Sequence, residues 1–331
     1  MAHEPDADRP LVSVALAAYN GERFLPQQLD SILQQTYRPL EIVASDDCSA
    51  DATWTILCDY ARRYPRLVRC ARNASNLGCT GNFAKAMSLC TGAFVALSDQ
   101  DDLWHPGKIE RLVAAIGDAD LVHSDARIVD ENGELVHSSL RRYSALPVTR
   151  RGFGDVLACN IVTGCTAMVR RSLVRRAQPF PGSIPHDMWL ALAAADGKGI
   201  RYVKDPLLDY RQHDANAIGA HAAEGARGLR VAAGTTWTGF LARQQELYRR
   251  NRDNLRRIAQ ESGAALTPAG FAHLRDQTEY YSSYFEKRLR LRAFLYYARH
   301  FRSMRGKKTV LRGVVDLVLS LVGEGSERGR A

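Results

Sequence analysis

The feature that most restricts the fold is an alternation of short apolar runs with stretches of helical periodicity in the first 125 residues. The apolar runs are rich in Val, Ile and Leu and are expected to be buried strands: 11–17, 40–45, 66–71, 93–98 and 119–125. Helical spacing of apolar residues lies between them, at 22–35, 51–63, 80–90 and 106–116. Strands that alternate with helices predict a mostly parallel sheet with flanking helices and right-handed crossovers.

The later part of the chain follows a different pattern. From about 150 to 213 the pattern is mixed, with an expected strand at 163–170 and an expected helix at 187–195. An Ala- and Gly-rich break near 215–235 is the best candidate for a domain boundary. The sequence therefore predicts a disordered tail, a catalytic α/β domain and a basic, mainly helical region, at residues 1–10, 11–220 and 221–331.

Charge is distributed unevenly along the chain. The net charge is +9, but residues 221–331 hold 21 Lys and Arg against 10 Asp and Glu, whereas residues 1–220 hold 24 against 26. The basic region is expected to face an anionic partner, and lipid headgroups, diphosphate-linked acceptors and nucleic acid all meet that requirement.

Features of the sequence also point to a compartment. The seven cysteines form no CxxC pair, the first ten residues lack an apolar signal region, and no apolar run reaches the roughly 18 residues that span a bilayer. We therefore expect a cytoplasmic protein.

The strongest chemical signal is the motif Ser98-Asp99-Gln100-Asp101-Asp102-Leu103-Trp104, directly after an expected buried strand. Three carboxylates in four residues repel one another, and a hard divalent cation such as Mg²⁺ or Mn²⁺ would relieve that repulsion. The alternative is a solvated acidic turn that caps the next helix. Because ligands bind at the carboxyl ends of strands in such sheets, a metal site is the favoured interpretation.

Two further polar segments follow expected strands. Asp46 and Asp47 come after the second, where a carboxylate can accept hydrogen bonds from a base or a ribose, or can form an Asx-turn. Asp51 in the same segment is expected to cap the following helix. The segment Ala17-Ala18-Tyr19-Asn20-Gly21 follows the first strand, where backbone groups and an aromatic ring can hold a base.

Taken together, the motifs resemble family 2 glycosyltransferases with the GT-A fold. The resemblance rests on Ala-Ala-Tyr-Asn-Gly (17–21), Ser-Ile-Leu-Gln-Gln-Thr-Tyr (31–37), Ser-Asp-Asp-Cys-Ser (45–49), Asn-Leu-Gly (76–78) and the acidic motif at 98–104. It covers roughly residues 11–215. The amino-acid sequence of the acidic motif, with Asn82-Phe83 upstream, is most similar to that of bacterial rhamnosyltransferase-type members, which use dTDP-sugars.

The resemblance implies roles for residues of the donor site. Asp47 would recognise the base, with Ala17 and Tyr19 beside it. Asp99 would lie near the ribose and the metal, Asp101 would bind the metal, and Asp102 would support it. The family's usual Arg after Asn-Leu-Gly is missing, and Asn82 or Lys85 is the expected replacement.

The resemblance also implies the catalytic and acceptor residues. His186-Asp187-Met188-Trp189-Leu190 is similar to the family's acidic helix start, which makes Asp187 the catalytic base, although a helix cap is the alternative. The segment Tyr210–His213 is similar to a late family motif, so His213 would contact the metal or the diphosphate and Arg211 would assist it. Gly164, Cys165 and Thr166 would form the acceptor-side loop.

The combined expectation is an inverting, metal-dependent transferase that moves a sugar from a nucleotide-diphosphate donor to a saccharide or polyprenol-linked saccharide. The leading donor is dTDP-rhamnose, and UDP-hexose and UDP-N-acetylhexosamine are alternatives. A non-catalytic nucleotide- or carbohydrate-binding protein is the alternative from another class. A nucleotidyltransferase would need a Gly-rich basic loop after the first strand, and a dinucleotide oxidoreductase would need a GxGxxG motif; the sequence has neither.

The basic region contains one more signal. In residues 309–322 Arg312, Asp316 and Ser320 recur every four positions among Val and Leu, which predicts a helix with a wide apolar face. Such a helix can lie on the inner face of the cell membrane or pack on the catalytic domain or a second subunit, and the sequence favours neither. A homodimer is thus one expected arrangement, nucleic acid is not an expected partner, and 140–151 is the expected lid or acceptor loop.

Overall fold

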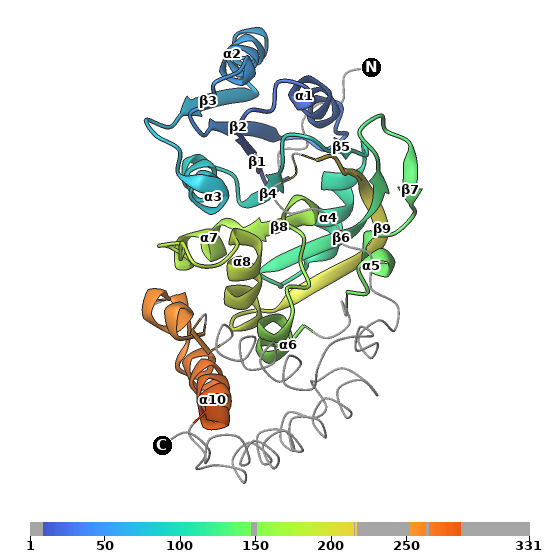
Figure 1. The fold of residues 1–331 in the computed structure, drawn as a ribbon. Coiled ribbons are helices and arrows are strands. Elements are labelled where there is room, and N and C mark those ends of the chain that lie inside the picture. Colours follow the sequence, from blue (N-terminus) through green and yellow to red (C-terminus); the bar gives the residue numbers. More distant parts are fainter. Residues whose placement is uncertain are drawn as a thin grey trace, which may run out of the picture.

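The computed structural model describes residues 9–146, 151–214, 216, 252–253, 255–262 and 265–285. They form a nine-stranded sheet with helices on both faces (Figure 1). The path through the sheet is β3-β2-β1-β4-β8-β6-β9-β5, and β7 pairs with β6 outside that path.

The first half of the sheet is parallel, as the alternating pattern predicts. β1 (Val12–Ala18) lies between β2 (Leu40–Asp46) and β4 (Phe94–Ser98), and β2 also pairs with β3 (Val68–Arg72). The crossovers contain α1 (Leu25–Leu33), α2 (Thr53–Arg63) and α3 (Gly78–Leu89). Each of these helices lies within the range that its apolar spacing predicts, to within two residues at its start.

The second half of the sheet is mixed. β8 (Ala167–Arg170) is antiparallel to both β4 and β6 (Leu121–Val129), and β9 (Ile200–Arg211) is parallel to β6. The short β5 (Leu103–Trp104) is antiparallel to the end of β9, and β7 (Leu135–His137) forms a hairpin with β6. This half departs from the expected parallel order because β8 inserts between two strands that precede it in the chain.

The remaining described helices follow the order of the chain. They are α4 (Lys108–Ile116), α5 (Leu140–Tyr143), α6 (Phe153–Ala158), the 3₁₀ turn η1 (Gly164–Thr166), α7 (Arg171–Arg176), α8 (His186–Ala195) and α10 (Pro268–Phe285). The expected strand at 163–170 is therefore wrong in its first residues. Gly164–Thr166 form η1 instead, and the strand begins at Ala167.

Two apolar cores cover the two faces of the sheet. Side chains of α1, α2 and α4 pack on one face, and side chains of α3, α6, α7 and α8 pack on the other. Along β1 the side chains alternate between the two cores, with Val14 and Leu16 in one and Ala15 in the other. Both faces of the parallel half are thus sealed, which leaves its polar groups at the ends of the strands.

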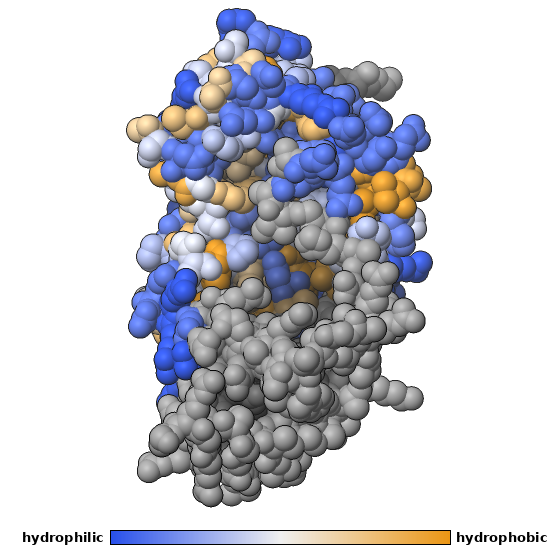
Figure 2. All heavy atoms as spheres, viewed as in Figure 1, coloured by the Kyte–Doolittle hydropathy of each residue, from blue (hydrophilic) through white to orange (hydrophobic). Residues whose placement is uncertain are grey.

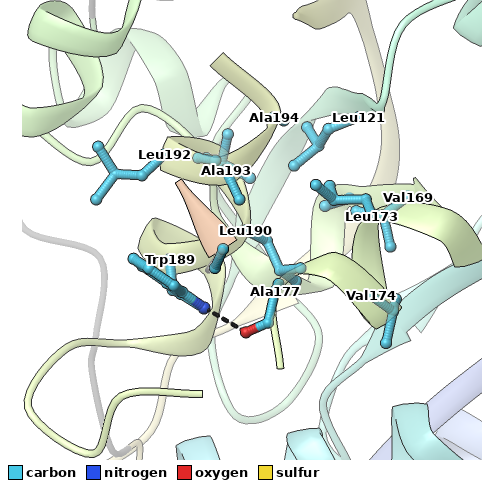
Figure 3. Close-up of a cluster of buried hydrophobic side chains, with 14 of the residues drawn as sticks. Leu121, Val169, Leu173, Val174, Ala177, Trp189, Leu190, Leu192, Ala193 and Ala194 are labelled. Atoms are coloured by element: carbon cyan, nitrogen blue, oxygen red, sulfur yellow. Dashed lines mark hydrogen bonds between the residues drawn. The ribbon is translucent and has the colours of Figure 1, made fainter. Parts of the chain in front are cut away.

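Helix α8 is central to the second core. Its residues from Trp189 to Ala194 are fully buried, and the Trp189 indole Nε1–H donates to the carbonyl oxygen of Ala177 at 2.8 Å (Figure 3). A helix that is apolar on all sides belongs inside a protein. This burial fixes the start of α8, and with it the position of Asp187.

Some of the segments predicted from the sequence lie outside the described residues. The tail at 1–8, the domain break at 217–235 and the amphipathic stretch at 309–322 lie outside the described residues, as do 147–150 of the expected lid; α5 lies within its first part. Of the basic region, residues 255–261 and α10 are described and are helical. Among the residues that the structure describes, no helix is long and apolar enough to cross a membrane.

One exposed apolar patch lies on the short strand β7. Leu135 and Val136 on β7 are 58% and 51% exposed. Figure 2 shows the patch as a hydrophobic area over the β6–β7 hairpin. The hairpin therefore projects apolar side chains at the rim of the molecule.

Candidate active site

Polar residues gather where the three central parallel strands end. β1, β2 and β4 run in the same direction, so Tyr19, Asp47 and Asp99, which follow them, lie along one edge of the sheet. The Asp47 amide N–H donates to the carbonyl oxygen of Ala18 at 2.8 Å, which joins two of these ends directly. The structure thus brings the residues that follow β1, β2 and β4 to one edge of the sheet.

Asp47 is held by the segment before α3. One carboxylate oxygen, Oδ1, accepts hydrogen bonds from the Asn73 amide and from the Leu77 backbone N–H, both at 2.8 Å. The side chain is buried, at 2% exposure. Asp47 therefore orders the loop that leads into α3, and its second oxygen is the one left for a ligand at this end.

The Asn82 side chain hydrogen-bonds to other parts of the fold. Its amide Nδ2 donates to the carbonyl oxygens of Ala18 and Ser45, and its Oδ1 accepts from Asn73 at 3.0 Å. These bonds tie α3 to the ends of β1 and β2 and leave the amide little capacity for a ligand. Lys85, the other expected replacement for the missing Arg, is exposed on α3.

Gln100, which lies between Asp99 and Asp101 in the acidic motif, makes a contact that the sequence did not reveal. Its side-chain amide makes two hydrogen bonds to the backbone of Tyr19, at 2.7 Å and 3.0 Å. A Cβ atom on Gly21 would collide with this amide, which explains the glycine there. The Tyr19 side chain remains 48% exposed beside the partly buried Ala17, so its ring is available at the rim.

The acidic loop concentrates negative charge away from water. Burial raises the pKa of Asp99 well above its usual range, and the charges of Asp102, Asp101 and Asp187 raise it further. Burial and the Asp101 charge raise the pKa of Asp102 to about 7. The pKa of Asp101 is also raised by burial, although His213 opposes that effect. The loop therefore holds carboxylates that a cation would stabilise in their charged form.

The end of β9 supplies cationic and imidazole groups to this loop. His213 Nε2 lies 2.9 Å from Asp101 Oδ2, and the His213 ring packs against Phe24 with centroids 4.9 Å apart. The structure thus brings together the expected metal-site residues Asp101 and His213. The antiparallel pairing of β5 with β9 produces this contact, because Leu103 lies opposite Asp209.

Arg211 lies behind the loop, not on its open side. It is 3% exposed, and its guanidinium donates to the carbonyl oxygens of Asp101 and Glu131 and to Gln27 Oε1, each at 2.9 Å. Its backbone N–H donates to Asp102 Oδ1 at 3.2 Å. Arg211 therefore clamps the acidic loop, whereas the sequence predicted a partner for the diphosphate.

Lys108 is a second group that the sequence did not reveal. It is fully buried, and its ammonium donates to the Cys165 carbonyl oxygen at 2.5 Å and lies 3.4 Å from the centre of the Trp104 ring. Burial lowers its pKa to about 7, against the charges of Asp102 and Asp99, which favour the ammonium form. A buried cation at a helix start needs such anions nearby, so Lys108 links α4, η1 and the acidic loop.

Asp187 is held by three donors at the start of α8, one of which is the Met188 backbone N–H. Its Oδ1 accepts from the Asn160 amide at 3.0 Å, and its Oδ2 accepts from the Gly164 backbone N–H at 3.1 Å. The carboxylate is partly exposed, and its charge acts on Asp99. Asp187 is thus fixed against η1 while part of it faces the acidic loop.

The expected acceptor-side loop is the element that joins the two halves of the site. Gly164 donates to Asp187, the Cys165 carbonyl accepts from Lys108, and the Cys165 sulfur lies within 4.8 Å of oxygens of Asp99 and Asp102. Thr166 is buried and its hydroxyl donates to the Thr163 carbonyl at 2.7 Å. Gly164 and Cys165 therefore contact Asp187, Lys108 and the acidic loop, and Thr166 closes the turn.

Gly164 leaves no room for a side chain. A Cβ atom there would lie 2.8 Å from Nε2 of His186, which stacks on Phe83 with ring centroids 3.8 Å apart. His186 is buried and burial lowers its pKa, so its neutral imidazole fills the space beside Asp187.

Replacing Gly164 by Ala is therefore expected to displace His186 and Asp187 and to lower turnover by about 100-fold, the typical cost of a 1 Å misplacement. Donor binding should change little, because the donor-side contacts lie on β1, β2 and β4. Steady-state kinetics together with nucleotide calorimetry would check this. An equal loss of turnover and of nucleotide affinity would contradict this prediction.

Cys79 also lies at the site. Burial and then the charges of Asp99, Asp187 and Asp47 raise the pKa of its thiol to about 12. Its sulfur lies 4.0 Å from Nδ1 of His186, so Cys79 is close to the start of α8. No motif in the sequence marked it.

The donor atoms suit a hard divalent cation. Asp99, Asp101 and Asp102 offer carboxylate oxygens, and the buried Oδ2 of Asp102 has no hydrogen-bond partner. An orphaned buried carboxylate oxygen is costly unless another ligand satisfies it. The loop that holds Asp99, Asp101 and Asp102, with His213 beside it, is therefore the part of the structure that fits a metal ion.

Comparison with known proteins places this arrangement in a family. Residues 13–177 match the profile of glycosyl transferase family 2. An uncharacterized protein of Mycobacterium tuberculosis is 29% identical over 216 residues, which is 61% of this chain and 59% of that protein. The dTDP-rhamnosyl transferase RfbG of Shigella flexneri is 26% identical over 219 residues, 62% of this chain and 74% of that protein. The match thus spans only about three fifths of the mycobacterial relative.

Solved structures show the same fold. The Staphylococcus aureus protein TarS (residues 1–349, with UDP) has a TM-score of 0.50 and 17% identity, covering 94% of this chain and 81% of that one. The mannosyltransferase PcManGT of Pyrobaculum calidifontis, with GDP-Man and Mn²⁺, has a TM-score of 0.50 and 18% identity, covering 96% and 88%. The expected GT-A fold is confirmed.

Proposed function

Because residues 13–177 belong to glycosyl transferase family 2, we propose that the chain transfers a sugar from a nucleotide-diphosphate donor to a saccharide or polyprenol-linked saccharide. One observation carries the proposal. The short turn η1 contacts the candidate base through the Gly164 N–H and reaches the acidic loop through Cys165. A proton acceptor and a diphosphate site are thus held by one rigid element.

Asp187 is the group that would accept the proton of the acceptor hydroxyl. Its three hydrogen-bond donors orient the carboxylate, and its partly exposed position leaves it accessible to an acceptor. Proton transfer to a positioned base typically contributes about 10²–10⁴-fold. Attack from the side of Asp187, opposite the departing diphosphate, would invert the anomeric centre.

On the donor side, Asp47 and Tyr19 would bind the base and Asp99 the ribose. Asp101 and Asp99 would hold Mg²⁺ or Mn²⁺, with Asp102 and His213 beside them; the bound cation would neutralise charge on the diphosphate. Arg211 keeps the backbone of this loop in place through the Asp101 carbonyl. Loop order, not a direct phosphate contact, is therefore the contribution of Arg211.

The leading donor is dTDP-rhamnose, with UDP-hexose or UDP-N-acetylhexosamine as alternatives. The similarity to RfbG, a dTDP-rhamnosyl transferase, supports the first. The acceptor would belong to bacterial cell-surface polysaccharide such as O-antigen. The excess of basic residues in 221–331 supports peripheral association with the cytoplasmic face of the membrane, and a homodimer is a further arrangement to test.

Nucleotide calorimetry tests the donor site. UDP, dTDP and GDP would each be titrated into the protein with and without Mn²⁺. We expect one nucleotide to bind in a metal-dependent way, and Asp101→Ala to weaken it by at least the roughly 10–100-fold known for losing a partner of a metal ligand.

Asp118→Asn is the matched control, because Asp118 is exposed and precedes β6 at the opposite end of the sheet. If none of the three nucleotides binds with Mn²⁺ present, the donor-site proposal is wrong. Binding without slow donor hydrolysis would favour the alternative of a non-catalytic binding protein.

A further inference from the structure

The donor atoms that converge most closely are not the set that the sequence predicted. Ligand atoms of Asp99, Asp102 and Cys165 all lie within 4.8 Å of one another. Asp101 is instead engaged with His213 Nε2 at 2.9 Å and with Asn216 at 3.4 Å. A sulfur atom thus lies where the sequence suggested oxygen and imidazole nitrogen alone.

A second, independent observation concerns Asp102. The residue is 1% exposed, its Oδ1 accepts from the Arg211 backbone N–H, and its Oδ2 accepts from no N–H or O–H group; the Cys165 thiol is the one further group that lowers the pKa of this carboxyl by hydrogen bonding. A buried carboxylate oxygen without a partner costs free energy unless a ligand completes it. Asp102 therefore leaves one coordination position open beside the sulfur.

Charge also favours a cation at this point. Asp99, Asp101 and Asp102 bring three negative charges when all three are ionised, and the nearby cations are the Lys108 ammonium and the Arg211 guanidinium. Lys108 donates to the Cys165 carbonyl oxygen and also lies close enough to favour the thiolate form of Cys165. Net negative charge is left over, and Asp187 adds to it.

Resting on the proposed metal-dependent function, we propose that the Cys165 sulfur is a metal ligand together with Asp99 and Asp102. A thiol is a soft donor that Mg²⁺ avoids, whereas Mn²⁺, Co²⁺, Zn²⁺ and Cd²⁺ accept it. The donor set then selects a transition metal over Mg²⁺. On coordination the sulfur binds as thiolate and its proton passes to the solvent.

The direct probe is Co²⁺, added without nucleotide to the full chain. A phosphine keeps the cysteines reduced, because a thiol reductant would itself bind the metal. A thiolate ligand gives a sulfur-to-cobalt charge-transfer absorption in the near ultraviolet, which oxygen and nitrogen ligands do not give. We expect this absorption in the wild-type protein and its loss in Cys165→Ser. The Kd for Co²⁺ should rise at least about 10-fold, and the preference for Mn²⁺ over Mg²⁺ should fall by a similar factor.

Two other cysteines are matched controls. Cys79→Ser removes the exposed thiol that senses Asp99, and Cys90→Ser removes a buried thiol that donates to the Ala86 carbonyl on α3. Both variants should keep the absorption. If Cys79→Ser abolishes it and Cys165→Ser does not, the assignment to Cys165 is overturned.

A measurement on the wild-type protein tests the sulfur ligand even if Cys165→Ser does not fold. The ¹¹³Cd resonance of the cadmium-loaded protein moves strongly downfield when one ligand is sulfur, so an oxygen-type shift would overturn the inference. Absence of Co²⁺ binding would overturn it too. Nucleotide calorimetry separates the two proposals. If nucleotide binding depends on the metal but neither the cobalt absorption nor the ¹¹³Cd shift indicates sulfur, the proposed function is retained and only the assignment of Cys165 as a ligand is wrong.

Discussion

Replacing Asp187 by Asn is expected to lower turnover by about 10²–10⁴-fold, because the amide can no longer accept the proton of the acceptor hydroxyl. The side chain keeps its size at the start of α8, although one of the bonds from Asn160 and Gly164 is lost. Metal-dependent nucleotide binding should remain within a few-fold, since the donor-side contacts are unchanged. Single-turnover transfer kinetics beside nucleotide calorimetry would measure the two effects separately.

Asp196→Asn is the control for this variant, because Asp196 ends the same helix and binds Thr267 outside the site. Turnover within about tenfold of wild type in Asp187→Asn would show that another group accepts the proton.

Arg211→Met is expected to destabilise the protein by at least about 1.5–3 kcal/mol, because it removes a buried guanidinium and the three hydrogen bonds that this group donates. The acceptors are the carbonyl oxygens of Asp101 and Glu131 and Gln27 Oε1. The alternative, a direct phosphate contact, predicts weaker nucleotide binding at unchanged stability. Urea unfolding at equilibrium distinguishes the two.

Arg23→Met is the matched control. Arg23 and Arg211 both lie 4.7 Å from the centre of the Phe24 ring, but the Arg23 side chain is 61% exposed in an ion pair with Glu131. Its loss should cost no more than about 1 kcal/mol. Similar costs for the two variants would contradict a clamping role for Arg211.

Several site residues were predictable because their signals are local. A buried parallel strand needs a continuous apolar run, and the polar residue that follows it must emerge at the carboxyl edge. Asp47 and Asp99 were found in this way. Asp187 and His213 depended on the family resemblance, since a single Asp at a helix start is equally typical of a cap.

Other side chains have roles that long-range hydrogen bonds decide. The sequence offered Asn82 and Arg211 as ligand contacts, but both donate to backbone carbonyl oxygens of residues that lie far away in the chain. Lys108 and Gln100 carried no signal, because the groups that make them important lie about 60 and 80 residues away in the chain.

The sequence by itself determined the parallel half of the sheet and the row of carboxylates at its edge, because apolar periodicity and strand ends are properties of adjacent residues. Only the tertiary structure decided which carboxylates have open coordination positions. β8 inserts antiparallel between β4 and β6 and places Cys165 beside Asp102, and β9 returns along β5 to bring His213 to Asp101. Pairing between strands far apart in the chain depends on how the whole sheet buries its apolar faces, and no local pattern encodes that choice.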